Sequence, residues 1–165
     1  MLEFDKSFPW DFFDGAAQGA PMMCGGGGII YISDNINFSL KAGLGLGTNN
    51  FAELMALKLL LLFAIEKGIK KLQVFGDSLV VINWAKGSQI CHILRLKPIV
   101  EEVHLHKYFF DLILFTHVYR EHNRLVDKLS KEAVRLDQGI WHIEETHESR
   151  TKGYYHMPYH YGEFM

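Results

Sequence analysis

The chain has 165 residues, of which 48% are hydrophobic and 13% aromatic. These values are typical of one folded domain with a sizeable core, and they exclude a disordered chain. The formal net charge is −2 with histidines neutral. No overall basic excess therefore indicates nucleic-acid binding, and any such binding must depend on a local patch or on metal ions.

Cysteine and histidine patterns indicate neither a disulfide framework nor a zinc site. Cys24 and Cys91 lie far apart and form no CxxC pair, so we expect free thiols. No cysteine pair precedes His156 and His160 at zinc-finger spacing.

The sequence predicts no membrane association. Asp5 and Asp11 interrupt the N-terminal apolar residues, so no signal peptide is visible. The longest apolar run, residues 59–65, is too short to cross a bilayer. We expect a soluble intracellular protein, although the sequence does not distinguish nucleus from cytoplasm and does not indicate an oligomeric state.

The first part of the chain is predicted to form strands joined by turns. Residues 10–13 are typical of a short strand that ends at Asp14, and a turn-rich stretch covers residues 16–28. Strands at residues 29–33 and 36–46 follow after short turns. This order predicts an antiparallel meander.

Helices and strands then alternate. Helices are predicted at residues 51–67, 79–86, 98–110 and 123–136, and strands at residues 72–75 and 112–119. The order predicts an α/β fold with a mixed sheet. We assign residues 1–139 to this domain and residues 140–165 to a C-terminal tail, for which the sequence indicates no role.

Two glycine-rich stretches resemble nucleotide-binding loops, but their spacing argues against that function. Gly43, Gly45 and Gly47 follow GxGxG and not the GxGxxG of a dinucleotide fingerprint. The run Gly25 to Gly28 lacks the Lys-Ser or Lys-Thr of a P-loop. We expect no nucleotide cofactor, and we expect these glycines to serve strand bends, turns or the close approach of a ligand.

One carboxylate in the first helix is unusual for its surroundings. From residue 51 to residue 65 only Glu53 and Lys58 are charged, so the helix is predicted to be buried nearly all round. A buried carboxylate is costly unless something compensates it. Asn50 and Glu53 have the spacing of a capping box, which offers a structural explanation beside a functional one.

Three further carboxylates occur where an α/β fold gathers its site. Asp14 ends the first predicted strand, Asp77 follows the strand after the long helix, and Asp127 lies in the last helix. Each alone is common as a turn or cap residue. Four converging carboxylates would repel one another without cations, and a carboxylate-bound pair of Mg²⁺ ions is the usual device for phosphodiester cleavage.

The motifs FFDGAAQG, TNNFAELMAL, FGDS and NRLVDKLS, in this order, resemble those of type 1 ribonuclease H domains, most closely the plant reverse transcriptase-type retroelement domain. The likeness covers roughly residues 8–136. It implies a ribonuclease H-like fold, a five-stranded mixed sheet flanked by helices. It also implies that Asp14, Glu53, Asp77 and Asp127 hold two Mg²⁺ ions, which Mn²⁺ can replace, with Asp14 bridging both.

Substrate contacts are expected from the loops around these carboxylates and from the last helix. The candidates are Gly15, Thr48, Asn49, Asn50, Ser78, Arg124, Lys128 and Lys131. Thr48 and the two asparagines could equally serve only as helix caps. Arg124, Lys128, Lys131 and Arg135 form one helical stripe, either a phosphate-binding surface or a solvated face. Leu125, Leu129 and Leu136 are expected to pack inward.

The chain departs from many bacterial members of the family in two respects. It has little room between Trp84 and Pro98 for their basic helical protrusion. Their flexible catalytic histidine also has no certain counterpart. His117 has the usual spacing but falls within a predicted strand, so His122 in the following loop is the better candidate for moving a proton. A surface loop histidine is the alternative.

Together these features predict a metal-dependent endonuclease that cleaves the RNA strand of RNA/DNA hybrids, which it would recognise by shape and 2′-hydroxyl groups. The alternative is a non-catalytic nucleic-acid-binding module derived from a retroelement ribonuclease H domain. An exonuclease or integrase-like enzyme on the same fold is disfavoured by the TNNxxEL motif. The sequence does not show whether the chain is free-standing or part of a larger protein.

Overall fold

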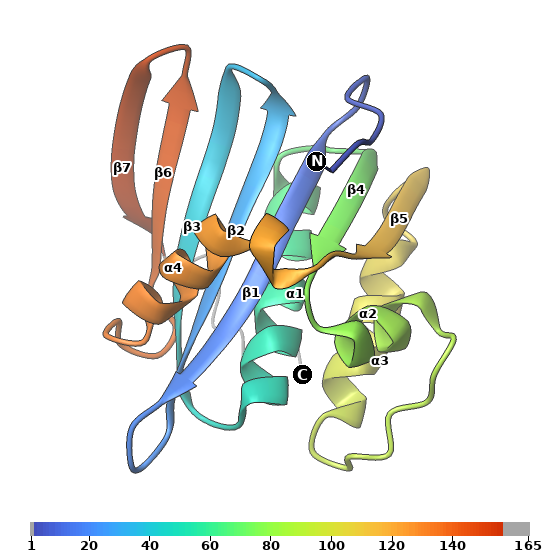
Figure 1. Ribbon diagram of the computed structural model, residues 1–165, viewed down its shortest axis with the longest axis vertical. Coiled ribbons are helices and arrows are strands. Elements are labelled where there is room, and N and C mark those ends of the chain that lie inside the picture. Colours follow the sequence, from blue (N-terminus) through green and yellow to red (C-terminus); the bar gives the residue numbers. More distant parts are fainter. Residues whose placement is uncertain (1, 157–165) are drawn as a thin grey trace.

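The computed structural model describes residues 2–156, which form one seven-stranded sheet with helices on both faces (Figure 1). The strands are β1 (Trp10–Gln18), β2 (Met23–Ser33), β3 (Ile36–Leu46), β4 (Lys71–Gly76), β5 (Leu112–His117), β6 (Trp141–His147) and β7 (Arg150–His156). The helices are α1 (Asn49–Glu66), α2 (Leu79–Lys86), α3 (Lys97–Lys107) and α4 (Arg124–Ala133), with a 3-10 turn η1 (Arg120–His122) before α4.

The sheet is mixed, in the order β5-β4-β1-β2-β3-β6-β7. Strands β1, β2 and β3 form the predicted antiparallel meander, whereas β4 runs parallel to β1 and β5 parallel to β4. Helix α4 lies on one face and α1 on the other (Figure 1). The main core fills the α1 side, between the sheet and helices α1, α2 and α3.

The expected number of five strands was wrong, because residues 141–156 extend the sheet. Strand β6 pairs with β3 from Ile36 opposite His147 to Ala42 opposite Trp141, and β7 pairs with β6. Trp141 and Ile143 are buried, which anchors β6 in the core. Their spacing of two residues is the strand signal that the surrounding histidines and glutamates concealed.

The first two strands are also longer than predicted. Asp14 does not end β1 but lies within it, opposite Gly27 of β2. The four consecutive glycines at residues 25–28 belong to β2 and not to a turn. Glycine usually weakens a strand unless another backbone approaches closely.

Two helices approach this pair of strands closely, one on each face. A Cβ atom on Gly15 would collide with the backbone of Ala52 in α1. On the other face, a Cβ atom on Gly27 would lie 2.7 Å from the backbone nitrogen of Ser130 in α4. The glycines of β1 and β2 therefore let both helices lie directly against the strands. The sequence had suggested bends, turns or the approach of a ligand for these glycines, and not the packing of helices.

The small side chains of α4 complete this packing. Its buried residues are Val126, Ser130 and Ala133. Leu125 is 49% exposed, so the expectation that it packs inward was wrong. A leucine on the inner face would not fit where the helix backbone already reaches the glycines of β2.

Helix α1 is buried nearly all round, as predicted, and it buries a charge. The Lys58 side chain is fully buried, and its Nζ lies 2.8 Å from Oε2 of Glu102 in α3. Because a charge in a protein interior is costly unless paired, this ion pair accounts for a lysine in an otherwise apolar helix.

Both cysteines lie in the interior of the fold. Cys24 and Cys91 are buried free cysteines, as expected. Among residues 2–156, no helix has the length and apolar character needed to cross a membrane.

We expect Gly25→Ala to lower the free energy of unfolding by about 1–3 kcal/mol, the usual cost of overpacking. The added methyl group would collide with the backbone of Ser130 and Val134. Urea denaturation measures the change. Gly153→Ala is the matched control, because its Cβ would first meet the His142 side chain at 3.4 Å, an ordinary contact. Equal stability of the two variants would contradict the packing argument.

We expect Lys58→Met to lower the free energy of unfolding by about 3–5 kcal/mol, because it leaves the buried Glu102 carboxylate uncompensated. The double variant Lys58→Met/Glu102→Leu should recover most of that loss, since neither charge then remains. A double-mutant cycle from thermal or chemical denaturation tests this. Additive losses would show that the two side chains do not depend on each other.

Candidate active site

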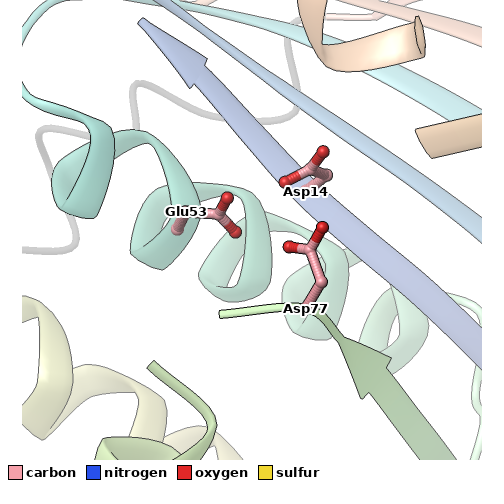
Figure 2. Close-up of side chains that lie close together, drawn as sticks. All are labelled: Asp14, Glu53 and Asp77. Atoms are coloured by element: carbon pink, nitrogen blue, oxygen red, sulfur yellow. The ribbon is translucent and has the colours of Figure 1, made fainter. Parts of the chain in front are cut away.

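Three carboxylates from three different parts of the chain meet beside the end of β4. Asp14 comes from β1, Glu53 from α1, and Asp77 from the residue after β4. One carboxylate oxygen of each lies within 4.8 Å of the others. Figure 2 shows the three side chains pointing toward one another. Residues distant in sequence are thus gathered into one acidic cluster.

Backbone packing places Glu53 in this cluster. The close contact between Gly15 and the Ala52–Glu53 peptide brings α1 against β1 beside Asp14, whose Oδ1 accepts a hydrogen bond of 2.9 Å from the Gly15 nitrogen. The cap of α1 is Thr48, whose Oγ1 accepts from the Phe51 nitrogen at 3.2 Å. A capping box between Asn50 and Glu53 is therefore not formed, and Glu53 is free to face the other acids.

Crowding and burial hold protons in the cluster. Burial raises the pKa of Glu53 to about 11, and a hydrogen bond to Asp14 adds to the rise. Burial raises the pKa of Asp14 to about 6. Burial also raises the pKa of Asp77, an effect that the Arg120 guanidinium opposes. One Glu53 oxygen, Oε2, is buried without a hydrogen-bond partner.

This donor set fits a divalent cation. All three groups offer hard oxygen ligands, which Mg²⁺ and Mn²⁺ prefer. The unpartnered Glu53 oxygen and the raised pKa values of Asp14 and Glu53 show that the protein's own groups do not compensate the charge of these carboxylates, as a bound cation would. Binding a cation would release the shared proton and compensate the buried charge.

The fourth expected carboxylate lies at the rim of the site. Asp127 of α4 lines the same cavity as the other three, but it is not part of the 4.8 Å cluster. Its Oδ2 accepts from Lys131 Nζ, one helical turn further on, at 3.0 Å. The lysine gives Asp127 a charged partner at the rim of the cavity.

The cavity over the cluster has a volume of about 440 Å³. Its lining consists of Asp14, Gly15, Ala16, Ala17, Gln18, Asn49, Asn50, Glu53, Asp77, Ser78, Arg120, Asp127 and Lys131. Ser78 is also the N-cap of α2, so the first turns of both α1 and α2 open onto the cavity. Helix N-termini attract anions such as phosphate.

Some expected substrate contacts lie beside the cavity and not on it. Thr48 caps α1 next to the lining residue Asn49. Arg124 and Lys128 are exposed on α4 outside the lining, whereas Lys131 is exposed and belongs to it. The basic stripe therefore begins away from the acidic cluster and reaches the cavity at Lys131.

Two residues near the site escaped prediction from the sequence. Arg120 in η1 lines the cavity, with its Nε 4.0 Å from Asp77 Oδ2. Asn123 is buried, and its Nδ2 donates to the Phe13 carbonyl oxygen at 2.9 Å. This bond joins the start of α4 to the strand that carries Asp14. Asn123 opens the NRLVDKLS motif, which was the only sequence signal for it.

The two candidate histidines are not part of the acidic cluster. His117 is the last residue of β5, as its predicted place in a strand required. His122 ends η1, with its side chain 30% exposed and its Nε2 3.9 Å from Glu121 Oε1. Neither ring belongs to the cavity lining. The structure itself therefore assigns no catalytic histidine.

Comparison with known proteins identifies the family. The model of the family described as "Reverse transcriptase-like" matches residues 12–133. An Arabidopsis thaliana protein provisionally named a ribonuclease H protein is 32% identical over 131 residues, which is 77% of this chain and 20% of that protein. The chain thus spans about a fifth of this curated relative.

Solved ribonucleases H share the fold. RNase H1 from the archaeon Halobacterium salinarum superimposes with a TM-score of 0.72 and 28% identity, over 78% of this chain and 98% of that one. LC11-RNase H1, isolated from compost by a metagenomic approach, was solved in complex with an RNA/DNA hybrid. It matches with a TM-score of 0.63 and 25% identity, over 76% of this chain and 96% of that one. The chain is therefore a ribonuclease H-like domain and belongs to the reverse transcriptase-like family.

Proposed function

We propose that the domain hydrolyses the RNA strand of RNA/DNA hybrids with the help of two divalent metal ions. The observation that carries this proposal is the convergence of Asp14, Glu53 and Asp77 within 4.8 Å in the site cavity. The likeness to a ribonuclease H solved with such a hybrid supports the choice of substrate.

The carboxylates would hold the ions, Mg²⁺ or Mn²⁺, with Asp14 central to the cluster and Asp127 adding a ligand from the rim. When bound, such ions activate a water molecule and stabilise the leaving 3′ oxygen, so no covalent enzyme intermediate is required. Asp14 and Glu53 would give up the proton that they share. Arg120, beside Asp77, is placed to attract the phosphate from the open side of the cavity.

The substrate would be positioned by groups around the acidic cluster. The first turns of α1 and α2, with Asn49, Asn50 and Ser78, would bind backbone phosphates. Gly15 would present its backbone to a 2′-hydroxyl, which distinguishes RNA from DNA. On α4, Arg124, Lys128 and Lys131 are exposed and would add phosphate contacts without reading sequence.

We expect Asp77→Asn to reduce hybrid cleavage to background, because the ions would be held less well and misplaced. Hybrid binding should persist or strengthen, since less negative charge faces the phosphates. Without divalent ions the Tm should stay level or rise, and the Tm gain on adding MgCl₂ should shrink. Asp111→Asn, at an exposed carboxylate after α3, is the matched control.

Cleavage and binding assays on RNA/DNA, RNA/RNA and DNA/DNA duplexes, with Mg²⁺, Mn²⁺ or EDTA, decide the outcome. A wild-type protein that binds the hybrid yet never cuts it with either metal would favour a non-catalytic binding module. A Tm that does not respond to either metal would remove the proposed metal site.

His122 remains our proposed proton-transfer residue, since it precedes Asn123 and follows Arg120 and Glu121 in the loop at the cavity edge. If it acts in this way, His122→Ala should lower turnover roughly a hundredfold or more and leave hybrid binding nearly unchanged. His92→Ala, at an exposed loop histidine, is the control. Equal turnover in the wild type and His122→Ala would exclude the role.

A further inference from the structure

Three neighbouring cavities follow one another from the active site to the C-terminal hairpin. The site cavity and a second cavity of about 380 Å³ share Gln18 and Lys131. The second and a third cavity of about 390 Å³ share Arg135. The third is lined by Tyr155 of β7. Each cavity shares lining residues with the next, and we call this series of neighbouring cavities the exit groove.

The far end of the exit groove presents an aromatic face. The Tyr155 side chain is 71% exposed, and its ring centroid lies 4.9 Å from that of His142 on the paired strand. His142 supports the ring on one side and leaves the rest to solvent. An exposed aromatic ring beside a groove is a stacking platform for an unpaired nucleic-acid base.

The charges along the exit groove nearly cancel. Lys131 is bonded to Asp127, and Glu132 lies 3.5 Å from Lys41, while Arg135 and Asp137 both line the third cavity. Phosphate attraction alone would therefore hold a nucleic-acid chain only weakly here. Stacking on Tyr155 is the stronger contribution, and it should depend little on salt.

We propose that the exit groove binds single-stranded nucleic acid that continues beyond the hybrid held in the active site, with one base stacked on Tyr155. A paired duplex has its bases stacked on one another and offers no free face to the ring except at its end. Since the family model ends at residue 133, the hairpin with Tyr155 lies outside the matched region. This inference rests on the proposed function, because it assumes that a hybrid occupies the site.

The test compares a blunt RNA/DNA hybrid with four variants that carry a single-stranded extension of about six nucleotides, one at each strand end. Binding is measured by fluorescence anisotropy in EDTA, so that no cleavage occurs. For at least one extension, we expect wild-type affinity to exceed that for the blunt hybrid by about fivefold to a hundredfold, the range for one stacked base. This gain should change little with salt.

Tyr155→Ala should abolish the gain and leave blunt-hybrid binding unchanged, whereas Tyr155→Phe should keep it because the ring remains. Tyr108→Ala removes another exposed tyrosine, at the end of α3, and is the matched control. Unchanged circular dichroism would show that each variant is folded. The proposal is overturned if no extension improves wild-type binding, or if Tyr155→Ala retains the gain.

A different result is expected if the proposed function is wrong and the protein does not bind RNA/DNA hybrids. If the wild type does not bind the blunt hybrid at all, a free single-stranded oligonucleotide replaces it in the same assay. Binding that Tyr155→Ala weakens and Tyr108→Ala does not would still support the exit groove. Equal binding by both variants, or none by the wild type, would overturn it.

Discussion

The close approach of two helices to opposite faces of β1 and β2 is the constraint on which the rest of the structure depends. Gly15 admits the backbone of α1, and the glycines at residues 25–28 admit α1 on one face and α4 on the other. Side chains at these positions would separate helix from sheet. Because Glu53 lies on α1 and Asp127 on α4, the same glycines set how near each carboxylate comes to Asp14.

Bringing acids together in this way opposes folding unless the charge is compensated. Strand β1 carries two buried aspartates, one outside the acidic cluster and one within it. Asp11 is fully buried, neither of its oxygens has a hydrogen-bond partner, and burial raises its pKa well above the usual range. Among residues 2–156 it is not part of the cluster of carboxylates that could share a cation. Asp14, three residues on, faces Glu53 and Asp77, and together they can bind a cation.

The order of elements from β1 to α4 and the identity of the clustered acids could be predicted from the sequence because both depend on local patterns. The spacing of hydrophobic residues predicted the helices, and the sequence motifs identified Asp14, Glu53 and Asp77 as candidate site residues. The ends of β1 and β2 could not be predicted, since Asp14-Gly15 and four glycines suggest turns when the helices above and below are unknown. Tertiary contact with α1 and α4 keeps these residues extended.

Contacts in the site between residues that are distant in the sequence could not be predicted either. Arg120 reaches Asp77 only because β4 and β5 lie side by side, and Asn123 bonds to Phe13 across 110 positions of the chain. Asp127 lies outside the 4.8 Å cluster and accepts a hydrogen bond from Lys131, a partner that the spacing of four residues permits but does not require.

The C-terminal hairpin links the edge of the sheet to the approach to the active site. Without β6, strand β3 would be an edge with unpaired backbone groups from Ile36 to Ala42, open to pairing with other chains. The hairpin covers β3 and moves the edge to β7, where exposed Arg150 and Lys152 disfavour further pairing. The same pairing brings Tyr155 beside the end of α4. A change that loosens Trp141 from the core would therefore uncover the sheet edge and displace the tyrosine together.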